Sequence, residues 1–142
     1  MAEKVFSDGW AAAWADQLNS SEDYRNAAAR WEGAIVIVMR ADSPMGIPEK
    51  MAVYVDLWHG ECREARVASE EDLEAVPYII SASPENWRRI LKGNLDPILA
   101  LMGGKLQLKK GSLISMLPYV KAAKELVVAA ARVETEFPEE WN

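Results

Sequence analysis

The chain has 142 residues, of which 50% are apolar and 27% are charged. This composition supports one domain with a sizeable hydrophobic core and argues against a generally disordered chain. The 22 acidic and 16 basic side chains leave a formal net charge of −6, which makes nucleic acids and anionic membrane surfaces poor partners.

The sequence shows no sign of a disulfide, a signal peptide or a membrane span. Cys62 is the single cysteine, so it forms neither an intrachain disulfide nor a cysteine-based zinc cluster. The first residues lack a secretory apolar run, and the longest apolar runs, residues 34–39 and 126–131, are far shorter than the roughly 20 residues that cross a bilayer. The C-terminus is no peroxisomal signal. We therefore expect a cytoplasmic protein that makes at most transient contact with membranes.

The first third of the sequence predicts two helices. Ser7 can cap the first helix, and Ser20 or Ser21 can cap the second. Gly33 is expected to end the second helix, because glycine readily takes the left-handed conformation. The apolar residues that recur once per turn of the first helix are Trp10, Trp14 and Leu18. Such a stripe usually packs into a core, although ligand stacking by this tryptophan pair is an alternative.

The middle of the chain predicts antiparallel strands. Residues 34–39 form a β-branched apolar run that is typical of a strand buried on both faces. Residues 50–58 alternate apolar and polar side chains, and a turn then leads into a weaker strand over about 62–68. The acidic residues 69–74 are expected to form a solvated loop. Residues 75–82 are a further strand candidate.

The C-terminal half predicts three short helices, one short strand and a final helix over about residues 119–132. Each short helix carries apolar side chains at positions i, i+3 and i+4 and is punctuated by glycine or proline. These triplets are Trp87/Ile90/Leu91, Ile98/Leu101/Met102 and Leu113/Met116/Leu117. Short helices gain little stability from their own hydrogen bonds, so such a wall is held by packing and can shift. By this pattern alone, an ordinary core is the simpler interpretation.

Catalytic and metal-binding candidates are few. His59 lies three residues before Cys62, and a thiol beside an imidazole can act as a nucleophile pair. They flank a turn, and the sequence identifies no third orienting group, so we favour a turn histidine and a partly buried thiol. Two ligands do not make a zinc site. Residues 103–105, Gly-Gly-Lys, lack the remaining positions of a phosphate loop and are interpreted as a helix end. We expect no cofactor and no metal.

One stretch resembles a known family. It contains Gly93, Asp96-Pro97, Gly103-Gly104-Lys105-Leu106 and Gly111-Ser112 in a fixed register. This pattern resembles the sterol carrier protein 2 (SCP-2) superfamily, whose members show a glycine, a polar residue near the next helix start, a Gly-Lys-Leu strand and a glycine turn into a helix. The resemblance extends more weakly over residues 31–133. We therefore expect one domain over residues 1–142, with residues 1–30 as an N-terminal helical extension.

The resemblance implies an α/β fold of the α+β kind: a mixed, largely antiparallel five-stranded sheet covered by helices on one face. It also implies an apolar tunnel between sheet and helices that holds a lipid, a fatty acyl chain or a sterol-like molecule. Carried over by position, the lipid-binding residues are Trp87, Leu91, Ile98, Leu101, Met102, Leu106, Leu113, Met116, Leu117, Val120, Leu126 and Val127.

The function expected from the resemblance is non-enzymatic carriage of a hydrophobic small molecule. Two alternatives stay open. In one, the chain is an accessory interaction or dimerisation domain, and Trp10, Trp14 and the N-terminal helices form a partner surface or homodimer seam. In the other, it is an enzyme that acts on a lipid-like metabolite through His59, Cys62 or Asp56.

Overall fold

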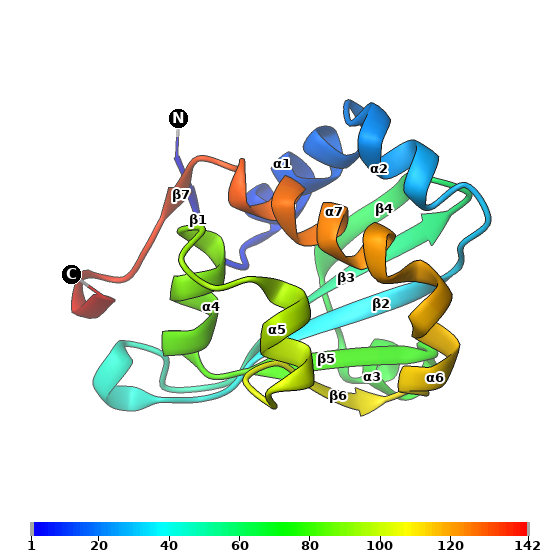
Figure 1. Cartoon of the computed structure of the whole chain (residues 1–142). Helices are drawn as coiled ribbons and strands as arrows, with labels where there is room; N and C mark the ends of the chain where they lie inside the picture. The colour runs from blue at the N-terminus through cyan, green and yellow to red at the C-terminus, as the bar shows by residue number, and fades with distance from the viewer. Residues whose placement is uncertain (1, 142) are drawn as a thin grey trace.

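A mixed five-stranded sheet lies at the centre of the structure, a computed structural model that describes residues 2–141. Its spatial order is β4-β3-β2-β5-β6 (Figure 1). The strands are β2 (Glu32–Met39), β3 (Met51–Trp58), β4 (Glu61–Val67), β5 (Tyr78–Ala82) and β6 (Gln107–Lys110). Strands β2 and β5 pair in parallel, and the other neighbours pair antiparallel. The predicted mixed, largely antiparallel sheet is confirmed.

Most helices cover one face of this sheet (Figure 1). They are α1 (Asp8–Asn19), α2 (Glu22–Ala27), α4 (Pro84–Leu91), α5 (Pro97–Met102) and α7 (Val120–Ala131). Helix α6 (Leu113–Met116) and the 3-10 turn η2 (Leu117–Tyr119) lead from β6 into α7. The short elements at the rim are β1 (Glu3–Lys4), η1 (Ser43–Met45), β7 (Thr135–Glu136) and η3 (Glu139–Trp141), with β1 and β7 paired in parallel.

Strand β2 is buried on both faces, as its apolar run predicts. Ile35 and Ile37 join the main core beneath the helices. Val36 and Val38 join a smaller cluster with Val76 on the opposite face. This division follows from the two-residue period of a strand, which sends neighbouring side chains to opposite faces. The main core is a single cluster of buried side chains whose members come from all parts of the chain, from Val5 to Trp141.

Helix α1 lies along the edge strand β4 and is tied to it at both ends. Near its start, Asp8 Oδ1 accepts a hydrogen bond from the Val67 N–H at 2.7 Å. At its end, the Asn19 side-chain amide donates to the Cys62 carbonyl at 3.0 Å and accepts from the Cys62 N–H at 2.8 Å. These bonds satisfy backbone groups of β4 that an open sheet edge would leave unpaired.

Both N-terminal helices begin where their serines predict, but the second ends earlier than expected. The Ser7 and Ser21 hydroxyls accept hydrogen bonds from the backbone N–H groups three residues later, at 3.2 and 3.0 Å. The prediction that Gly33 ends the second helix is wrong: α2 ends at Ala27, and Gly33 lies inside β2 with φ +147°. A side chain at Gly33 would press on Pro77, 3.3 Å from the Cβ position, so glycine permits a close approach of two strands there.

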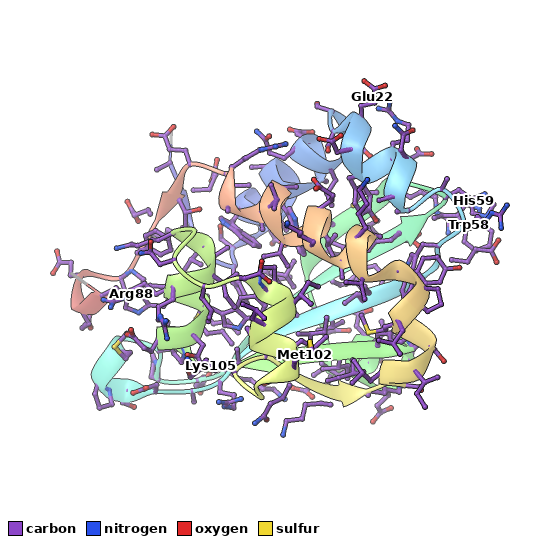
Figure 2. The ribbon with its side chains drawn as sticks, viewed as in Figure 1. Glu22, Trp58, His59, Arg88, Met102 and Lys105 are labelled. Carbon is purple, nitrogen blue, oxygen red and sulfur yellow. The ribbon has the colours of Figure 1, made fainter. Side chains whose placement is uncertain are left out.

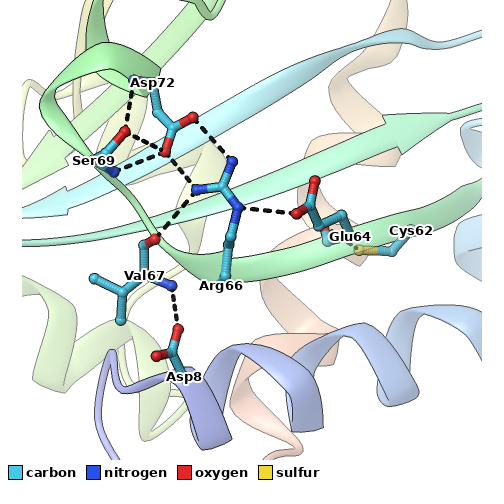
Figure 3. A network of polar contacts seen from close by, with 7 residues as sticks. All are labelled: Asp8, Cys62, Glu64, Arg66, Val67, Ser69 and Asp72. Carbon is cyan, nitrogen blue, oxygen red and sulfur yellow. Dashed lines mark hydrogen bonds and ion pairs between the residues drawn. The ribbon is translucent and has the colours of Figure 1, made fainter.

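Residues 70–75 form helix α3 (Glu70–Ala75) on the opposite face of the sheet, so the prediction of a solvated loop is wrong. Ser69 and Asp72 make a capping box, in which each side chain accepts from the other residue's backbone N–H. Arg66 on β4 clasps the Asp72 carboxylate with two hydrogen bonds of 2.6 and 3.0 Å (Figure 3). Leu73 packs against the smaller core cluster. Tertiary contacts therefore stabilise a helix whose composition indicates a loop.

The Asp72 contacts make a pH-dependent contribution to stability. The Arg66 guanidinium, and next the Ser69 N–H, hold the pKa of the Asp72 carboxyl well below its usual range. A carboxyl whose pKa is lowered by folding stabilises the protein above its unfolded pKa of about 4, and this contribution is lost as the pH falls toward the folded value. We expect Asp72→Asn to lower the free energy of unfolding at neutral pH by about 1 kcal/mol, the usual worth of a capping interaction.

The difference between Asp72→Asn and the wild type is expected to shrink steadily below about pH 4. Urea unfolding of both proteins over a pH series measures it. A difference that stays constant over the series would contradict the role given to the Arg66–Asp72 pair.

Candidate functional site

An apolar cavity lies between the sheet and its helical cover. Its floor consists of strand side chains that point toward the helices: Ile35, Ile37, Leu57 and Ile80. Its roof is one side of α7: Ala122, Ala123, Leu126, Val127 and Ala130. The remaining lining residues are Trp10, Trp14, Tyr24, Trp31, Trp87, Leu91, Pro97, Ile98, Leu101, Leu106, Met116 and Tyr119.

Two aromatic clusters flank the cavity and hold the helices above the sheet. In the first, the rings of Phe6, Trp10, Trp14 and Trp87 contact one another with centroid distances of 5.1 to 5.5 Å. In the second, Trp31 lies between Tyr78 and Tyr119, at 5.1 and 4.9 Å. Large rings at the sides and alanines in the roof leave a space in the middle, because an alanine fills little of the gap beneath α7.

The indole N–H groups of the lining tryptophans bond to protein acceptors. These bonds join Trp10 to Thr135 Oγ1 (3.0 Å), Trp14 to the Leu126 carbonyl (3.0 Å), Trp31 to the Gly33 carbonyl (2.8 Å) and Trp87 to the Val38 carbonyl (2.9 Å). Because these buried N–H donors already have protein acceptors, a ligand does not have to supply a hydrogen-bond acceptor for them. The indole rings therefore present mainly apolar carbon atoms to the cavity.

Tyr24 of the lining carries no charge at neutral pH. Burial raises the pKa of Tyr24 above its ordinary value, and the nearby Cys62 raises it further. The Tyr119 hydroxyl donates to the Arg30 carbonyl at 3.4 Å. Among the described residues of the lining, none has a carboxylate, an imidazole, a thiol or a cationic group. The cavity is thus an uncharged, oily compartment.

The cavity is narrow, with a volume of about 50 Å³. Pockets that hold small molecules span about 300–1,000 Å³. A dry cavity costs about 24 cal/mol per Å³, so 50 Å³ costs about 1 kcal/mol, whereas 300 Å³ would cost about 7 kcal/mol. The second figure is a large part of the roughly 5–15 kcal/mol that stabilises a domain. A lipid therefore requires the cavity to widen.

A second, more open hollow of about 390 Å³ lies along the edge strand β6, between α5 and α6. Its lining residues are Leu101, Gly104, Leu106, Gln107, Leu108, Gly111 and Leu113. We call it the β6 groove. Leu101 and Leu106 line both the β6 groove and the inner cavity, so these two side chains separate the interior from the surface.

Eight of the twelve residues carried over from the family resemblance line the inner cavity. They are Trp87, Leu91, Ile98, Leu101, Leu106, Met116, Leu126 and Val127. The structure places the other four outside the lining: Met102, Leu113 and Leu117 are exposed, and Val120 is half-buried. Consecutive residues of an α-helix lie about 100° apart around the axis. In α5, Leu101 faces the cavity, and Met102 is turned toward solvent.

Several residues of the cavity lining lie outside the set carried over from the family resemblance. Trp10 and Trp14 were interpreted as core anchors, and the structure confirms this, since both are at most 1% exposed. They are also part of the cavity wall. The same burial overturns the alternative in which this pair forms a partner surface or homodimer seam. The strand alternation of Ile35, Ile37 and Leu57 is the sequence signal that could have identified the floor.

The sequence profile of the SCP-2 sterol transfer family matches residues 13–115. The chain belongs to the SCP-2 sterol transfer family. The resemblance found in the sequence is thereby confirmed, and lipid or sterol binding is the class of function that the family supports. A comparison with curated protein sequences gives no significant match.

Solved structures of the family share the fold. A crystal structure of sterol carrier protein 2 is 41% identical, with a TM-score of 0.84, over 92% of this chain and 99% of that one. A conserved hypothetical protein of Thermus thermophilus, described as possibly a sterol carrier protein, is 39% identical, with a TM-score of 0.82, over 96% of this chain and 94% of that one. Palmitated SCP2L2 from Aedes aegypti is 14% identical, with a TM-score of 0.50, over 87% of this chain and 96% of that one.

The three candidate catalytic side chains have other partners in the structure. Cys62 is buried, and its thiol donates to the Glu64 carbonyl at 3.5 Å. His59 lies on an exposed turn beside Trp58 (Figure 2). Its ring stacks on the Trp58 ring, and its Nε2 is hydrogen-bonded to Glu32 at 2.6 Å. The Asp56 carboxylate is clasped by Arg63 through two hydrogen bonds of 3.1 Å.

Two further features bear on the kind of site. Within residues 2–141, no group of three or more His, Cys, Asp or Glu side chains is arranged to hold a metal ion. Over the same range, no helix is long and apolar enough to cross a bilayer.

The Cys62 thiol is expected to be unreactive. Burial raises its pKa to about 12, so very little thiolate is present at neutral pH. We expect alkylation by iodoacetamide in the folded protein to be at least about a hundredfold slower than in urea, measured by mass spectrometry over time. Equal rates in the two states would contradict the assigned burial and revive Cys62 as a nucleophile.

Proposed function

We propose that the protein binds one apolar molecule in the cavity between the sheet and α7 and carries it without changing it chemically. One observation supports this most: the cavity is walled by apolar side chains, and the indole N–H groups of its tryptophans bond elsewhere in the protein. Family membership gives the same class of ligand, since the family is one of sterol transfer.

The driving force for binding is removal of apolar surface from water. Each Å² of apolar surface buried contributes about 25 cal/mol, so a ligand with a long hydrocarbon tail gains most from such a site. The lining offers no charged partner, so a polar headgroup remains at the surface while the tail enters. This arrangement separates binding of the tail from recognition of the headgroup.

A fatty acyl chain is the ligand class that we favour. A narrow cavity of about 50 Å³ widens more easily for a slender chain than for a rigid ring system. Aedes aegypti SCP2L2, which has the same fold, is described as palmitated. Sterols are bulkier and require a larger displacement of the helical cover.

Widening is expected at α5 and α6. Helix α5 contributes Ala100 to the buried core, and α6 contributes Met116. Elements with so few buried anchors open at low cost, whereas the sheet is held by continuous strand pairing. Gly104, with φ +81°, follows α5 directly and gives its end freedom to move.

The absence of chemistry is supported by the lining itself. Proton transfer and nucleophilic attack need a titratable group within hydrogen-bond reach of the substrate. The described lining residues provide hydrocarbon, thioether, indole and phenol groups. Of the two phenols, burial raises the pKa of Tyr24, which makes it a poor base, and the Tyr119 hydroxyl donates to the Arg30 carbonyl. Mass spectrometry of the molecule extracted from the purified protein tests the ligand class: we expect a fatty acid or another single-chain lipid, unaltered. A polar metabolite in its place would contradict the proposal.

A cavity-filling variant tests the site directly. Ala122 lines the cavity from α7, and Ala131, on the same helix, does not. We expect Ala122→Leu to weaken binding of a fluorescent fatty acid at least about tenfold, because the added side chain takes the space of the ligand. Its free energy of unfolding should change by no more than about 2 kcal/mol, since filling the void offsets overpacking. The matched control Ala131→Leu should bind normally, and equal affinity in a folded Ala122→Leu would contradict the site.

Ligand linkage provides an independent check on the wild type. A ligand at 100 times its Kd that binds only the folded state stabilises it by about 2.7 kcal/mol. For a domain of this size we expect saturating fatty acid to raise the melting temperature by about 5–10 °C. No rise, together with unchanged tryptophan fluorescence, would count against the carrier function.

A further inference from the structure

Tyr24 is the polar exception in the cavity lining. Its side chain comes from α2, is 2% exposed and borders the cavity. Its backbone N–H donates to Ser21 Oγ and its carbonyl accepts from the Ala28 N–H, but within residues 2–141 its hydroxyl has no hydrogen-bond partner. The tryptophan N–H groups of the lining and the Tyr119 hydroxyl all have acceptors in the protein. One phenol hydroxyl is therefore left to bond with whatever fills the cavity.

The Tyr24 hydroxyl borders space that a small molecule can enter. In the described part of the chain, the buried side-chain atom that is both unpaired and closed off from any such space is Arg40 Nη1. The Tyr24 hydroxyl is unpaired without being closed off. Because Tyr24 is buried and lines the cavity, that space is the cavity itself.

The hydroxyl is neutral, so it can donate one hydrogen bond and accept others. Burial raises the pKa of Tyr24, and Cys62 raises it further. The Cys62 thiol is not its partner, since that thiol bonds to the Glu64 carbonyl. A neutral phenol suits an uncharged oxygen, such as that of a hydroxyl or a keto group. A carboxylate would have to leave water for an apolar compartment with a single free donor, which is far more costly.

Tyr24 lies across the cavity from the side at which we expect it to widen. Helix α2 packs against one side of α7, and α5 packs against the other side (Figure 1). A chain that enters past α5 therefore runs beneath the alanines of α7 before it reaches Tyr24. Because the headgroup remains at the surface, the atoms that meet Tyr24 belong to the far part of the tail.

We propose that the ligand is an acyl chain with an uncharged oxygen in the far part of its tail, and that the Tyr24 hydroxyl binds this oxygen. The inference rests on the proposed carrier function and narrows its ligand class. A plain hydrocarbon tail that fills the cavity leaves the hydroxyl without a partner, and a buried polar group without a partner is unfavourable. A tail that carries a hydroxyl or keto group at this point removes the penalty. Tyr24 thus selects between tails that are otherwise alike.

The rest of the lining discriminates against an oxygen elsewhere along the buried tail. A hydroxyl that lies against Ile35, Ala122 or Val127 meets hydrocarbon alone, so it loses its hydration without gaining a partner. A hydroxyl beside the headgroup stays in water and is neither favoured nor penalised. The affinity for an oxygenated chain is therefore expected to depend on the position of the oxygen and not only on its presence.

The test compares stearic acid with 12-hydroxystearic acid and 2-hydroxystearic acid, each titrated against a bound fluorescent fatty acid. Selectivity is the Kd of stearic acid divided by the Kd of 12-hydroxystearic acid. We expect Tyr24→Phe to lower this selectivity at least about tenfold, because the hydroxy acid loses its partner while stearic acid no longer strands a hydroxyl. Tyr24→Phe should bind stearic acid at least as tightly as the wild type does. The affinity for 2-hydroxystearic acid relative to stearic acid should be the same in both proteins.

Tyr54 provides the matched control. It lies on β3 and packs against the smaller core cluster on the opposite face of the sheet. Tyr54→Phe therefore removes a phenol hydroxyl outside the cavity and should leave the affinities for all three acids unchanged. Tyr24→Phe should keep or raise the melting temperature of the ligand-free protein, because the hydroxyl that it removes has no partner in the described part of the chain. A lower melting temperature with unchanged selectivity would assign this hydroxyl a structural role and overturn the proposal.

The outcomes separate this proposal from the carrier function. Equal selectivity in the wild type and Tyr24→Phe, with stearic acid bound by both, overturns the proposal and leaves the carrier function standing. An equal fall of selectivity in Tyr119→Phe assigns the oxygen to the other phenol and also overturns it. Cholesterol binding that weakens in Tyr24→Phe, with unchanged selectivity between the acids, identifies a sterol hydroxyl as the partner and overturns the acyl ligand. Failure of the wild type to bind any of the acids overturns both.

Discussion

The structure depends on how α7 is held above the sheet. Bulky rings set the spacing: Trp14 reaches α7 and donates to the Leu126 carbonyl, while Tyr119 just before the helix packs against Trp31. Between these supports, α7 faces the strands with alanines, which do not fill the gap. The aromatic contacts thus keep α7 at a distance from the sheet that its alanines are too small to fill, and the cavity is the result. The N-terminal helices belong to this arrangement, because Trp10 and Trp14 are buried in the same core as the strands.

The same constraint divides the molecule into a firm part and a yielding part. The sheet is firm because β2 is paired on both sides and buried on both faces. The yielding part is α5, β6 and α6, which surround the β6 groove. A small dry cavity lowers the free energy of unfolding only slightly, whereas a large cavity is stable only when a ligand occupies it. Opening of the cavity is therefore expected at one edge of the sheet.

Local sequence signals predicted the elements well where they act alone. The Ser83-Pro84 start of α4 and the apolar run of β2 needed no distant partner. Helix α3 was missed although Ser69 and Asp72 give a local helix-start signal, because the acidic composition pointed to a loop. Its further support is tertiary: Arg66 reaches it from β4, and Leu73 packs beneath the sheet. The cavity lining shows the same limit. The triplet of α5 identifies an apolar side of the helix, but its rotation about the axis is decided by packing, so Leu101 faces inward and Met102 outward. The overall net charge of −6 gave no indication that residues 86–133 carry nine basic and two acidic side chains, because a sum over the chain hides how charges are distributed along it.

Methyl NMR spectroscopy with palmitate tests the central claim most directly, namely that an acyl chain enters between the sheet and α7. We expect nuclear Overhauser contacts from the chain's methylene groups to the methyl groups of Leu106, Met116 and Leu126, with resonance shifts through α5 and α6. Val36 and Val38, which lie on the opposite face of the sheet, should be unchanged. Contacts confined to exposed side chains such as Ile114, or no contacts at saturating palmitate, would contradict the account.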